Sequence, residues 1–239
     1  MSLLVVTDLC HTYPDGMEAL HDVSFTLAEG ERAALIGPNG AGKTTLQLRL
    51  AGLLWSEGNI TVDGKTLTKG TIKMLRSRIG ITFQNPDDQL FCPTILDDIT
   101  YGLLQMGLSN DEAQDKCMVI MEKFDLRGYE KRSAFHLSIG ERRRAALAAV
   151  LVMEPKLLLM DEPSAFLDPS GRRELGALLA TLPQAMILAT HDLEFARHLC
   201  PRTIVLHGRT IRADGETDAL MSDEKLMEET GLEVPYSLR

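Results

Sequence analysis

The chain has 239 residues and a formal net charge of −9 at pH 7, with 44% hydrophobic and 25% charged residues. This composition is that of an ordinary globular protein of one or two domains, and it excludes disorder and fibrous repeats. The longest apolar run, residues 145–153, is too short to span a bilayer. The acidic balance disfavours work on the phosphate backbone of nucleic acid, so we expect no nucleic-acid partner. The N-terminal apolar run, residues 3–6, lacks the pattern of a signal peptide, so we expect a cytoplasmic protein.

The first part of the chain predicts an antiparallel sheet. Residues 3–6, 23–27 and 60–62 are short strand-like segments, and they are joined by turn signals such as Pro14-Asp15-Gly16 and Asp63-Gly64. We expect these strands to lie beside the main core of the protein.

Five further apolar runs predict a parallel core. They cover residues 33–36, 79–83, 157–160, 186–189 and 203–206, and helical patterns separate most of them. Continuous apolar strands of this kind are typical of a mostly parallel sheet with helices on both faces. The predicted fold class is therefore α/β.

Two regions outside the strands are predicted to be helical. Residues 93–156 are interpreted as a helical subdomain, with Leu96, Ile99 and Leu103 on one helix face. Residues 212–239 are interpreted as a C-terminal helical tail. The tail is either an appended helix that packs on a partner or, the commoner case, a marginal surface helix.

A glycine-rich segment matches the phosphate-binding motif G-x-x-x-x-G-K-[ST] between a predicted strand and a helical pattern with Leu46, Leu50, Leu53 and Leu54 on one side. Glycines let successive N–H groups point at phosphate oxygens, and the helix that follows adds its positive end. We expect the lysine to contact the β- and γ-phosphates and the threonine hydroxyl to bind Mg²⁺. A chance lysine in a glycine-rich turn is the alternative, which the flanking elements disfavour. The motif consists of Gly37, Pro38, Asn39, Gly40, Ala41, Gly42, Lys43 and Thr44.

Two adjacent carboxylates, Asp161 and Glu162, follow the apolar run 157–160 and precede Pro163. Neighbouring strand residues point to opposite faces, but the twist at a strand end can present both side chains to one cleft. We expect Asp161 to hold Mg²⁺ through water and Glu162 to be the general base for the attacking water. Alone, such a pair is usually a solvated strand end; the phosphate loop upstream favours the functional interpretation.

Three further segments indicate a particular class of phosphate-loop protein. They are Leu137-Ser138-Ile139-Gly140-Glu141, the segment from Ser164 to Asp168, and Thr190-His191-Asp192. Their order and spacing resemble the nucleotide-binding subunits of ATP-binding cassette (ABC) transporters over nearly the whole chain. The resemblance implies an ATPase that uses ATP and Mg²⁺, with residues 1–239 forming a single domain. It also implies a phosphate-loop NTPase core, an N-terminal antiparallel β subdomain and a helical subdomain that carries the signature motif.

The resemblance implies that two copies share the ATP sites. In that family the signature of one subunit completes the ATP site of the other, so Ser138 and Gly140 would contact the γ-phosphate across a homodimer interface, or across a heterodimer with a related ATPase. A serine and free N–H groups at a helix start form an anion site. Asp168 would reach the facing phosphate loop; as a simpler alternative, it is an N-cap before Pro169.

The family roles also extend to three residues of the nucleotide site. Tyr13 would stack on adenine, Gln84 would sense Mg²⁺ and the membrane partner, and His191 would hold the γ-phosphate and the attacking water. The simpler alternatives are a turn aromatic, a strand-end residue and a structural histidine. The residues expected to act in catalysis are Glu162, His191 and Gln84; those expected to hold Mg²⁺ are Thr44, Gln84 and Asp161; those expected to bind ATP are Tyr13, Gly37, Pro38, Asn39, Gly40, Ala41, Gly42, Lys43, Thr44, Thr45, Ser138, Gly140 and Asp168.

One position departs from the family pattern. Residue 139 is isoleucine where the family usually has glycine, and a β-branched residue disfavours positive φ, so the backbone there must have negative φ. We expect the signature to function with an altered hydrolysis rate.

Residues 83–91 are similar to a segment of energy-coupling-factor importers, particularly of their cobalt and nickel branch, and residues 231–235 resemble the tail of that branch. The resemblance implies a transmembrane coupling subunit that docks near the glutamine loop and a membrane subunit that binds the substrate. Leu90 and Phe91 are expected to be exposed, with core positions as the alternative. We therefore expect a peripheral protein on the cytoplasmic face of the cell membrane that powers uptake of cobalt or nickel. A vitamin importer of the same type is the alternative.

Other classes fit the sequence less well. DNA-repair ABC ATPases insert a long coiled coil between the phosphate loop and the signature, and no sustained heptad pattern lies there. Ribosomal members carry two cassettes, whereas each motif occurs once in this chain. An Asn-Lys-x-Asp guanine signal is lacking, which disfavours a GTPase.

Overall fold

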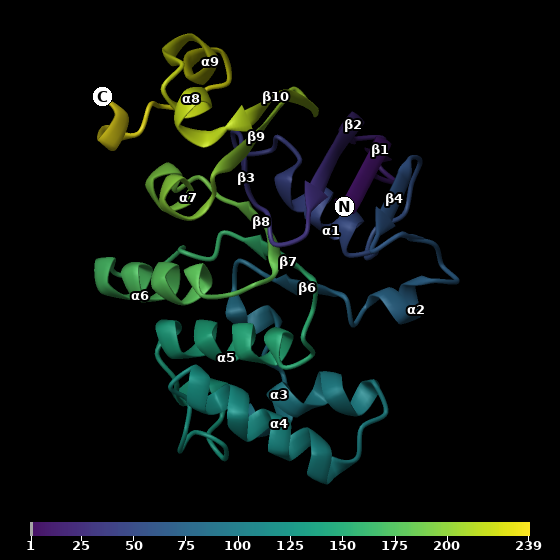
Figure 1. Ribbon diagram of the computed structural model, residues 1–239, viewed down its shortest axis with the longest axis vertical. Coiled ribbons are helices and arrows are strands. Elements are labelled where there is room, and N and C mark those ends of the chain that lie inside the picture. The colour runs from purple at the N-terminus through teal and green to yellow at the C-terminus, as the bar shows by residue number, and fades with distance from the viewer. Residues whose placement is uncertain (1) are drawn as a thin grey trace.

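Two β-sheets and the helices around them make up residues 2–239, which are the residues that the computed structural model describes (Figure 1). The first sheet is antiparallel, with the strand order β2-β1-β4-β5. It confirms the antiparallel sheet that the N-terminal segments predict. Its strands are β1 (Ser2–Thr12), β2 (Glu18–Ala28), β4 (Asn59–Val62) and β5 (Lys65–Thr66).

Strands β1 and β2 are longer than the predicted segments 3–6 and 23–27. The pairing of β1 with β2 shifts register between Val6 and Leu9, and Asp8 and Asp22 both have a φ of 49°. A bulge of this kind interrupts the alternation of apolar and polar residues while the strand continues. The alternating pattern in the sequence therefore ends at the bulge, whereas strands β1 and β2 continue beyond it.

The second sheet has six strands in the order β10-β9-β3-β8-β7-β6 (Figure 1). All neighbours in it are parallel except β10, which is antiparallel to β9. The predicted mostly parallel core is confirmed. Its strands are β3 (Arg32–Ile36), β6 (Ile79–Thr82), β7 (Leu157–Asp161), β8 (Ala185–Ala189), β9 (Arg202–His207) and β10 (Thr210–Glu216).

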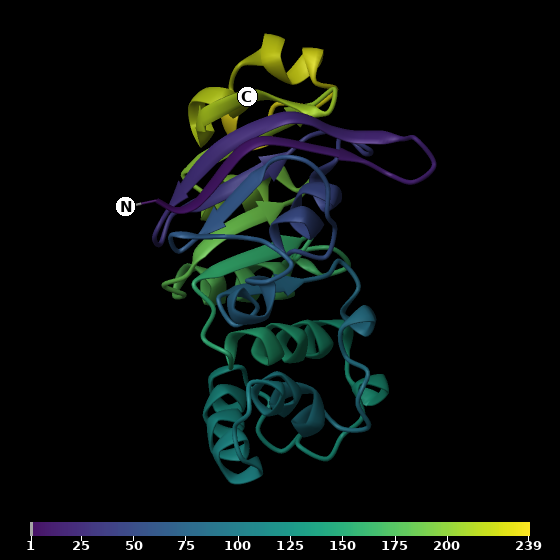
Figure 2. The ribbon, with the colours of Figure 1, turned by 90° about the vertical axis from the view of Figure 1, so that its right-hand side faces the viewer.

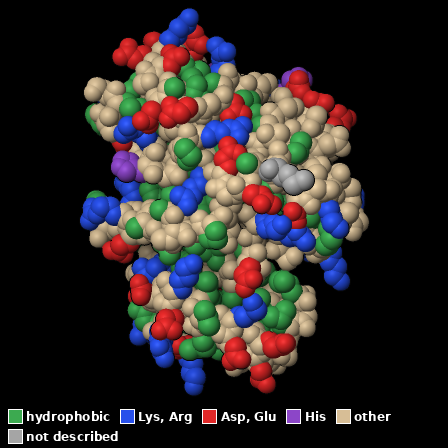
Figure 3. All heavy atoms as spheres, in the orientation of Figure 1, with side chains coloured by type: hydrophobic (Ala, Val, Ile, Leu, Met, Phe, Trp, Pro, Cys, Tyr) green, Lys and Arg blue, Asp and Glu red, His purple; other side chains and the backbone are tan. Residues whose placement is uncertain are grey.

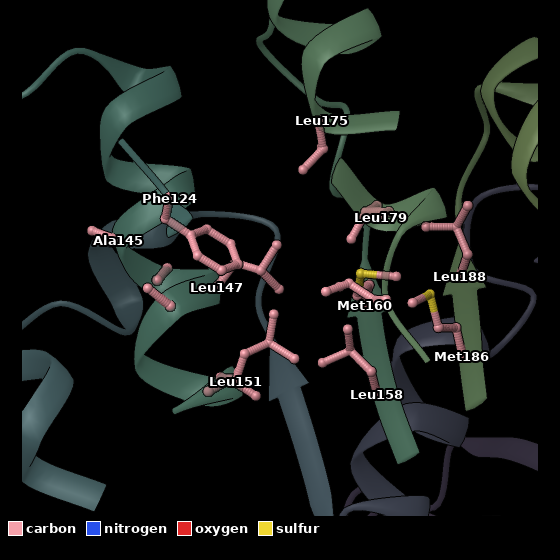
Figure 4. Close-up of a cluster of buried hydrophobic side chains, with 14 of the residues drawn as sticks. Phe124, Ala145, Leu147, Leu151, Leu158, Met160, Leu175, Leu179, Met186 and Leu188 are labelled. Carbon is pink, nitrogen blue, oxygen red and sulfur yellow. The ribbon is translucent and has the colours of Figure 1, made fainter. Parts of the chain in front are cut away.

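Alternate residues of the parallel strands bury two separate cores, one on each face of the sheet. On β7, Leu157 and Leu159 belong to the core that includes the antiparallel sheet, and Leu158 and Met160 belong to the core beneath the helices. Figure 4 shows Leu147 directed from its helix toward this second face. In Figure 2 the antiparallel strands lie on the near side of the six-stranded sheet. Two helices that pack on the helical side are α6 (Pro169–Ala180) and α7 (Leu193–Leu199).

The predicted helical region, 93–156, forms the lower part of the molecule in Figure 1. Ile99 and Leu103 are buried as predicted, whereas Leu96 is partly buried and Ile95 takes its place. No helix within residues 2–239 is long and apolar enough to cross a bilayer. The helices here are α3 (Ile95–Gln105), α4 (Asn110–Lys123) and α5 (Ile139–Leu151), with the short η2 (Ala134–His136) before α5. Two short helical segments precede the region, α2 (Ile72–Leu75) and η1 (Pro86–Asp88).

The helix after the glycine-rich loop, α1 (Lys43–Leu50), is shorter than predicted. Leu46 and Leu50 are buried, but Leu53 lies beyond the helix and is 49% exposed. The chain turns at Gly52, which has a φ of 68°. Arg49 holds the turned segment through hydrogen bonds to the carbonyl oxygens of residues 54, 56 and 57.

The C-terminal tail differs from the prediction in its start and in its packing. Strand β10 continues to Glu216, so residues 212–216 are not helical, and the tail helices begin at Thr217. Met221 and Met227 are buried against the chain's own core, which corrects the expectation of a marginal surface helix. The helices are α8 (Thr217–Met221) and α9 (Glu224–Glu229), followed by η3 (Tyr236–Leu238).

Candidate active site

The glycine-rich loop connects β3 to α1 in a backbone conformation that requires glycine at two positions. Gly37 has a φ of 154°, and a Cβ atom there would lie 2.1 Å from the carbonyl oxygen of Leu206. Gly42, the N-cap of α1, has a φ of 103°, and its Cβ would lie 2.5 Å from the carbonyl oxygen of Ala19. The loop therefore brings backbone N–H groups to the positive end of a helix, which is an anion-binding arrangement.

Lys43 is held over this loop. Its Nζ donates hydrogen bonds to the carbonyl oxygens of Gly37, at 2.7 Å, and Pro38, at 3.1 Å. Burial lowers the pKa of Lys43, while the nearby carboxylates of Glu162 and Asp161 raise it. A buried ammonium group in this position is suited to contact phosphate oxygens.

Asp161 is the last residue of β7 and lies beside the phosphate loop. Its Oδ2 accepts a hydrogen bond of 2.7 Å from Thr44 Oγ1. Burial raises the pKa of Asp161, which means that its negative charge is poorly solvated. Gln47 ties α1 to the same strand, because its Nε2 donates to the carbonyl oxygen of Met160 at 2.8 Å. A hydroxyl and a poorly solvated carboxylate side by side are the oxygen donors that Mg²⁺ prefers.

Glu162 is buried, and its carboxylate is oriented by the loop after β8. Its Oε2 accepts a hydrogen bond of 2.9 Å from Thr190 Oγ1, and its Oε1 accepts one of 3.0 Å from the backbone N–H of His191. His191 Nδ1 lies 2.8 Å from the same Oε1. The backbone φ of Glu162 is 45°, and both Glu162 and Asp161 line one cleft.

Tyr13 and Gln84 lie at the same cleft. The Tyr13 hydroxyl is 2.9 Å from Thr45 Oγ1, and the Tyr13 ring packs edge-on against His11 at 4.7 Å between centroids. Gln84 lies two residues after β6, the edge strand of the six-stranded sheet, and also lines the cleft. Stacking of Tyr13 on adenine stays a prediction.

The cleft has a volume of about 840 Å³, which suits a nucleotide. Gly37 and Pro38 lie in the loop behind it. The predicted site residues that line it are Tyr13, Asn39, Gly40, Ala41, Gly42, Lys43, Thr44, Thr45, Gln84, Asp161, Glu162 and His191.

Ser138, Gly140 and Asp168 lie outside this cleft. Ser138 is the N-cap of α5: its Oγ accepts from the N–H of Glu141, and Glu141 Oε2 accepts from the N–H of Ser138 at 2.7 Å. Ile139 is the first residue of that helix and so takes the negative φ expected for it. Asp168 is the N-cap of α6, with Oδ1 accepting from the N–H of Gly171 at 2.8 Å.

Three residues that hydrogen-bond to the predicted site residues or to their strands have no predicted role. Thr190 stands directly before His191, and that position was its only signal. Gln47 lies one helical turn after Lys43 and gave no signal, because its bond is to backbone. Arg143 is buried, although a run of three arginines, such as the one from residue 142, is typical of a solvated helix face.

The segment after Gln84 differs in part from the prediction. Phe91 is 67% exposed as expected, but Leu90 is only 7% exposed and belongs to the helical core. Phe91 packs edge-on against exposed Tyr101 at 5.2 Å between ring centroids. Among residues 2–239, no group of three His, Cys, Asp or Glu side chains is placed to hold a metal ion.

A glycine-rich loop between β3 and α1, together with two carboxylates at the end of β7, two strands away in the same sheet, defines the nucleotide site of a phosphate-loop ATPase. The chain belongs to the ABC transporter family, whose family model matches residues 20–165. It is an ATP-binding, ATP-hydrolysing transporter subunit.

Several relatives match over nearly the whole chain. A predicted ABC transporter ATP-binding protein of Gloeobacter violaceus is 45% identical over 98% of each chain. The energy-coupling factor transporter ATP-binding protein EcfA of Methanothermobacter thermautotrophicus is 36% identical over 98% of this chain and 77% of its own length. The solved structure of CbiO1 of Clostridium perfringens, part of the ABC transporter complex CbiONQ, superposes with a TM-score of 0.83, at 33% identity over 95% of this chain and 94% of that chain.

Proposed function

We propose that this chain is the ATPase subunit of an energy-coupling-factor importer that takes up a transition-metal ion such as cobalt or nickel. The observation that carries the proposal is the exposed Phe91–Tyr101 pair, an apolar surface formed by the segment that follows Gln84 and by helix α3. The similarity to EcfA and to CbiO1 supports the importer type. The metal substrate rests on the segments 83–91 and 231–235, which resemble the cobalt and nickel branch.

The geometry of the cleft supports the proposed catalytic roles. The loop N–H groups and Lys43 bind the phosphates, and Glu162 accepts the proton of the attacking water while Thr190 and His191 hold its carboxylate. Catalysis then depends on positioning and on charge stabilisation rather than on covalent chemistry.

Thr44 and Asp161 fit the Mg²⁺ that accompanies ATP, because their oxygens already lie 2.7 Å apart at the end of the phosphate loop. Gln84, which lines the same cleft, offers a third oxygen. When bound, Mg²⁺ neutralises charge on the phosphates.

Two copies of the chain form the working ATPase. Ser138, Gly140 and Asp168 lie outside the cleft of their own chain, and the start of α5 carries the N–H groups and the serine of an anion site. In a homodimer, these residues face the ATP bound by the other copy; a heterodimer with a related ATPase would use the same surface. Residues 1–239 act as one ABC ATPase domain, with the helical subdomain presenting the signature.

A transmembrane coupling subunit binds the helical side. Phe91, Tyr101, Leu104 and Met106 are exposed large apolar residues at and after the glutamine loop, and together they form a docking patch. The chain is then a peripheral protein on the cytoplasmic face of the cell membrane, and a separate membrane subunit binds the substrate. On the face shown in Figure 3, acidic and basic side chains are intermixed, which does not favour a nucleic-acid partner.

Purification and transport assays test this function. We expect the chain to be recovered with membrane proteins and to power ATP-dependent uptake of Co²⁺ or Ni²⁺ into reconstituted vesicles. Phe91→Glu with Tyr101→Glu should abolish recovery of the membrane proteins and leave ATP binding intact. Val119→Glu, at a residue that is 72% exposed on α4, is the matched control and should change neither. Recovery with nucleic acid or ribosomes, or uptake of a vitamin in place of the metal ions, would contradict the proposal.

A further inference from the structure

Arg143 lies in α5 with its guanidinium directed away from solvent, and its side chain reaches two other segments of the chain. Its Nη2 donates hydrogen bonds to the carbonyl oxygens of Gln84, at 3.0 Å, and Ala165, at 2.9 Å. Its Nη1 lies 3.4 Å from the carbonyl oxygen of Glu162. One guanidinium therefore contacts the main chain of the glutamine loop and of the turn that carries Glu162.

Burying the charged guanidinium of Arg143 costs free energy, because the charge loses its contact with water. Arg143 is 7% exposed and forms no ion pair with any residue that the structure describes. Burial lowers the pKa of Arg143, and the nearby Glu162 carboxylate raises it. The hydrogen-bond partners of this buried charge are three backbone carbonyls. Loss of any of these bonds would leave a buried donor unsatisfied, so the guanidinium holds the carbonyls in fixed positions.

The turn after β7 needs such support. Glu162 and Phe166 both have positive φ, at 45° and 63°, a conformation that non-glycine residues adopt only where the surroundings enforce it. The carbonyls of Glu162 and Ala165, which Arg143 binds, belong to this turn. The direction of the Glu162 carboxylate depends on the same backbone.

The glutamine loop has two further contacts with the same helix. Arg142 Nη1 lies 2.8 Å from Asp87 Oδ1, and Gln89 Nε2 donates to the carbonyl oxygen of Ala146 at 2.7 Å. Helix α5 begins at the signature residues and continues through Arg142, Arg143 and Ala146. Helix and loop are therefore connected at three points along one helix face.

We propose that Arg143 is a positioning residue for hydrolysis, which holds the backbones of Gln84 and of the Glu162 turn in a fixed relation to the signature helix. The inference rests on the proposed roles of Gln84 and Glu162. A movement of α5 on dimer closure then moves the glutamine loop and the general base together.

Kinetics of the full-length ATPase test this role. Arg143→Met removes the donors and keeps an unbranched apolar stem; we expect kcat to fall at least tenfold while the KM for ATP changes less than threefold. Arg144→Met is the matched control, because Arg144 Nε donates to the carbonyl oxygen of Phe124, away from the cleft; its kcat should stay within twofold of wild type. Should Arg143→Met fail to fold, Arg143→Gln is measured against the same criteria.

Two comparisons separate positioning from loss of stability. If Arg143 acts through Glu162, Arg143→Met combined with Glu162→Gln should be no more than twofold slower than Glu162→Gln alone. Hydrogen exchange of the backbone amides of Glu162 and of residues 164–166 should be faster in Arg143→Met than in Arg144→Met. A kcat for Arg143→Met within twofold of that of Arg144→Met, or fully multiplicative losses in the double variant, would overturn the inference. Wild-type turnover by Glu162→Gln would instead refute the proposed general base.

Discussion

The backbone of Glu162 sets the direction of the most important side chain in the cleft. Its φ of 45° departs from strand geometry. As a result, the Glu162 carboxylate lines the same cleft as that of Asp161, the residue before it. Regular strand geometry would have put the two carboxylates on opposite faces. Three contacts then hold the Glu162 carboxylate: the Thr190 hydroxyl, the His191 N–H and the His191 ring.

Removal of the His191 ring should affect hydrolysis more than ATP binding. His191→Ala keeps the backbone N–H bond to Glu162 and loses the ring at 2.8 Å. We expect kcat to fall about 100-fold, as for the loss of one well-placed donor, with little change in the KM for ATP. Steady-state ATPase assays measure both values. His198→Ala removes an exposed histidine that lies on α7 and outside the cleft, and it should behave as wild type; equal losses in both variants would contradict the assigned role.

Ile139 in the signature should alter the rate of hydrolysis. Its side chain lies at the first position of α5, between Ser138 and Gly140. Ile139→Gly removes a bulky side chain where the start of α5 would contact the ATP bound by the other copy. We expect kcat of the assembled complex to rise at least about twofold, because small errors in the position of the signature relative to ATP slow the reaction. An unchanged rate in the complex would reject this interpretation.

Sequence motifs predict the residues of this site better than they predict the residues that support them. Gly42, Lys43 and Thr44 are consecutive residues of a short phosphate-binding motif, so a short pattern predicts their positions. Arg143 and Gln47 bind backbone carbonyls from distant segments. Any residue can supply a carbonyl, so no pattern of side chains in the sequence indicates that these two are buried and paired.

The start of α5 is held by a capping box between Ser138 and Glu141 and by a further hydrogen bond from Tyr129. Glu141 Oε1 accepts a hydrogen bond of 2.7 Å from the Tyr129 hydroxyl, and Oε2 accepts one of 2.7 Å from the Ser138 N–H. These bonds lower the pKa of Glu141 to about 2. The cap therefore fixes the backbone of the signature.

Neutralising Glu141 should cost stability in a pH-dependent way. Because its folded pKa lies below the ordinary value of 4.5, the stabilisation is fully present above that value and is lost as the pH falls toward 2. We expect Glu141→Gln to lower the free energy of unfolding by about 1 kcal/mol at pH 7, a usual value for a helix cap. Denaturant melts at several pH values should show this difference shrink between pH 5 and pH 2. Glu122→Gln changes an exposed residue and serves as the control; a difference independent of pH would contradict the assigned bonds.

Long strands were harder to predict than short ones. Strand β8 is buried along its length and β6 is buried except at Ile81, so their predicted limits are close to the observed ones. Strands β1 and β2 contain register shifts at which charged residues such as Asp8 and Asp22 occur. The alternation of apolar and polar residues breaks at these positions, so the predicted strands are shorter than the observed ones.

At the scale of the whole molecule, the C-terminal helices complete the fold of this chain. Met221 and Met227 are almost fully buried, and Thr217 bonds to Thr203 of β9 at 2.9 Å. Helical spacing in the sequence indicated the tail helices but not the surface that they cover. That surface is created by strands β9 and β10, whose register the sequence does not show.

Truncation of a tail methionine should destabilise the protein. Met227→Ala should lower the free energy of unfolding by about 2–5 kcal/mol, as for other buried methionines. Met118→Ala, at a residue that is 40% exposed on α4, is the control and should cost far less. Chemical denaturation measures both. If the two variants lose the same free energy, the tail does not pack as described.

The molecule as a whole is half of the proposed ATPase, since its signature residues and Asp168 lie away from its own cleft. The most direct test is the oligomeric state of Glu162→Gln with MgATP, measured by light scattering, together with its ATPase rate. We predict a stable dimer that retains ATP and hydrolyses it at least about 100-fold more slowly than wild type, because the general base is lost. A monomer at saturating ATP, or turnover at the wild-type rate, would contradict the account.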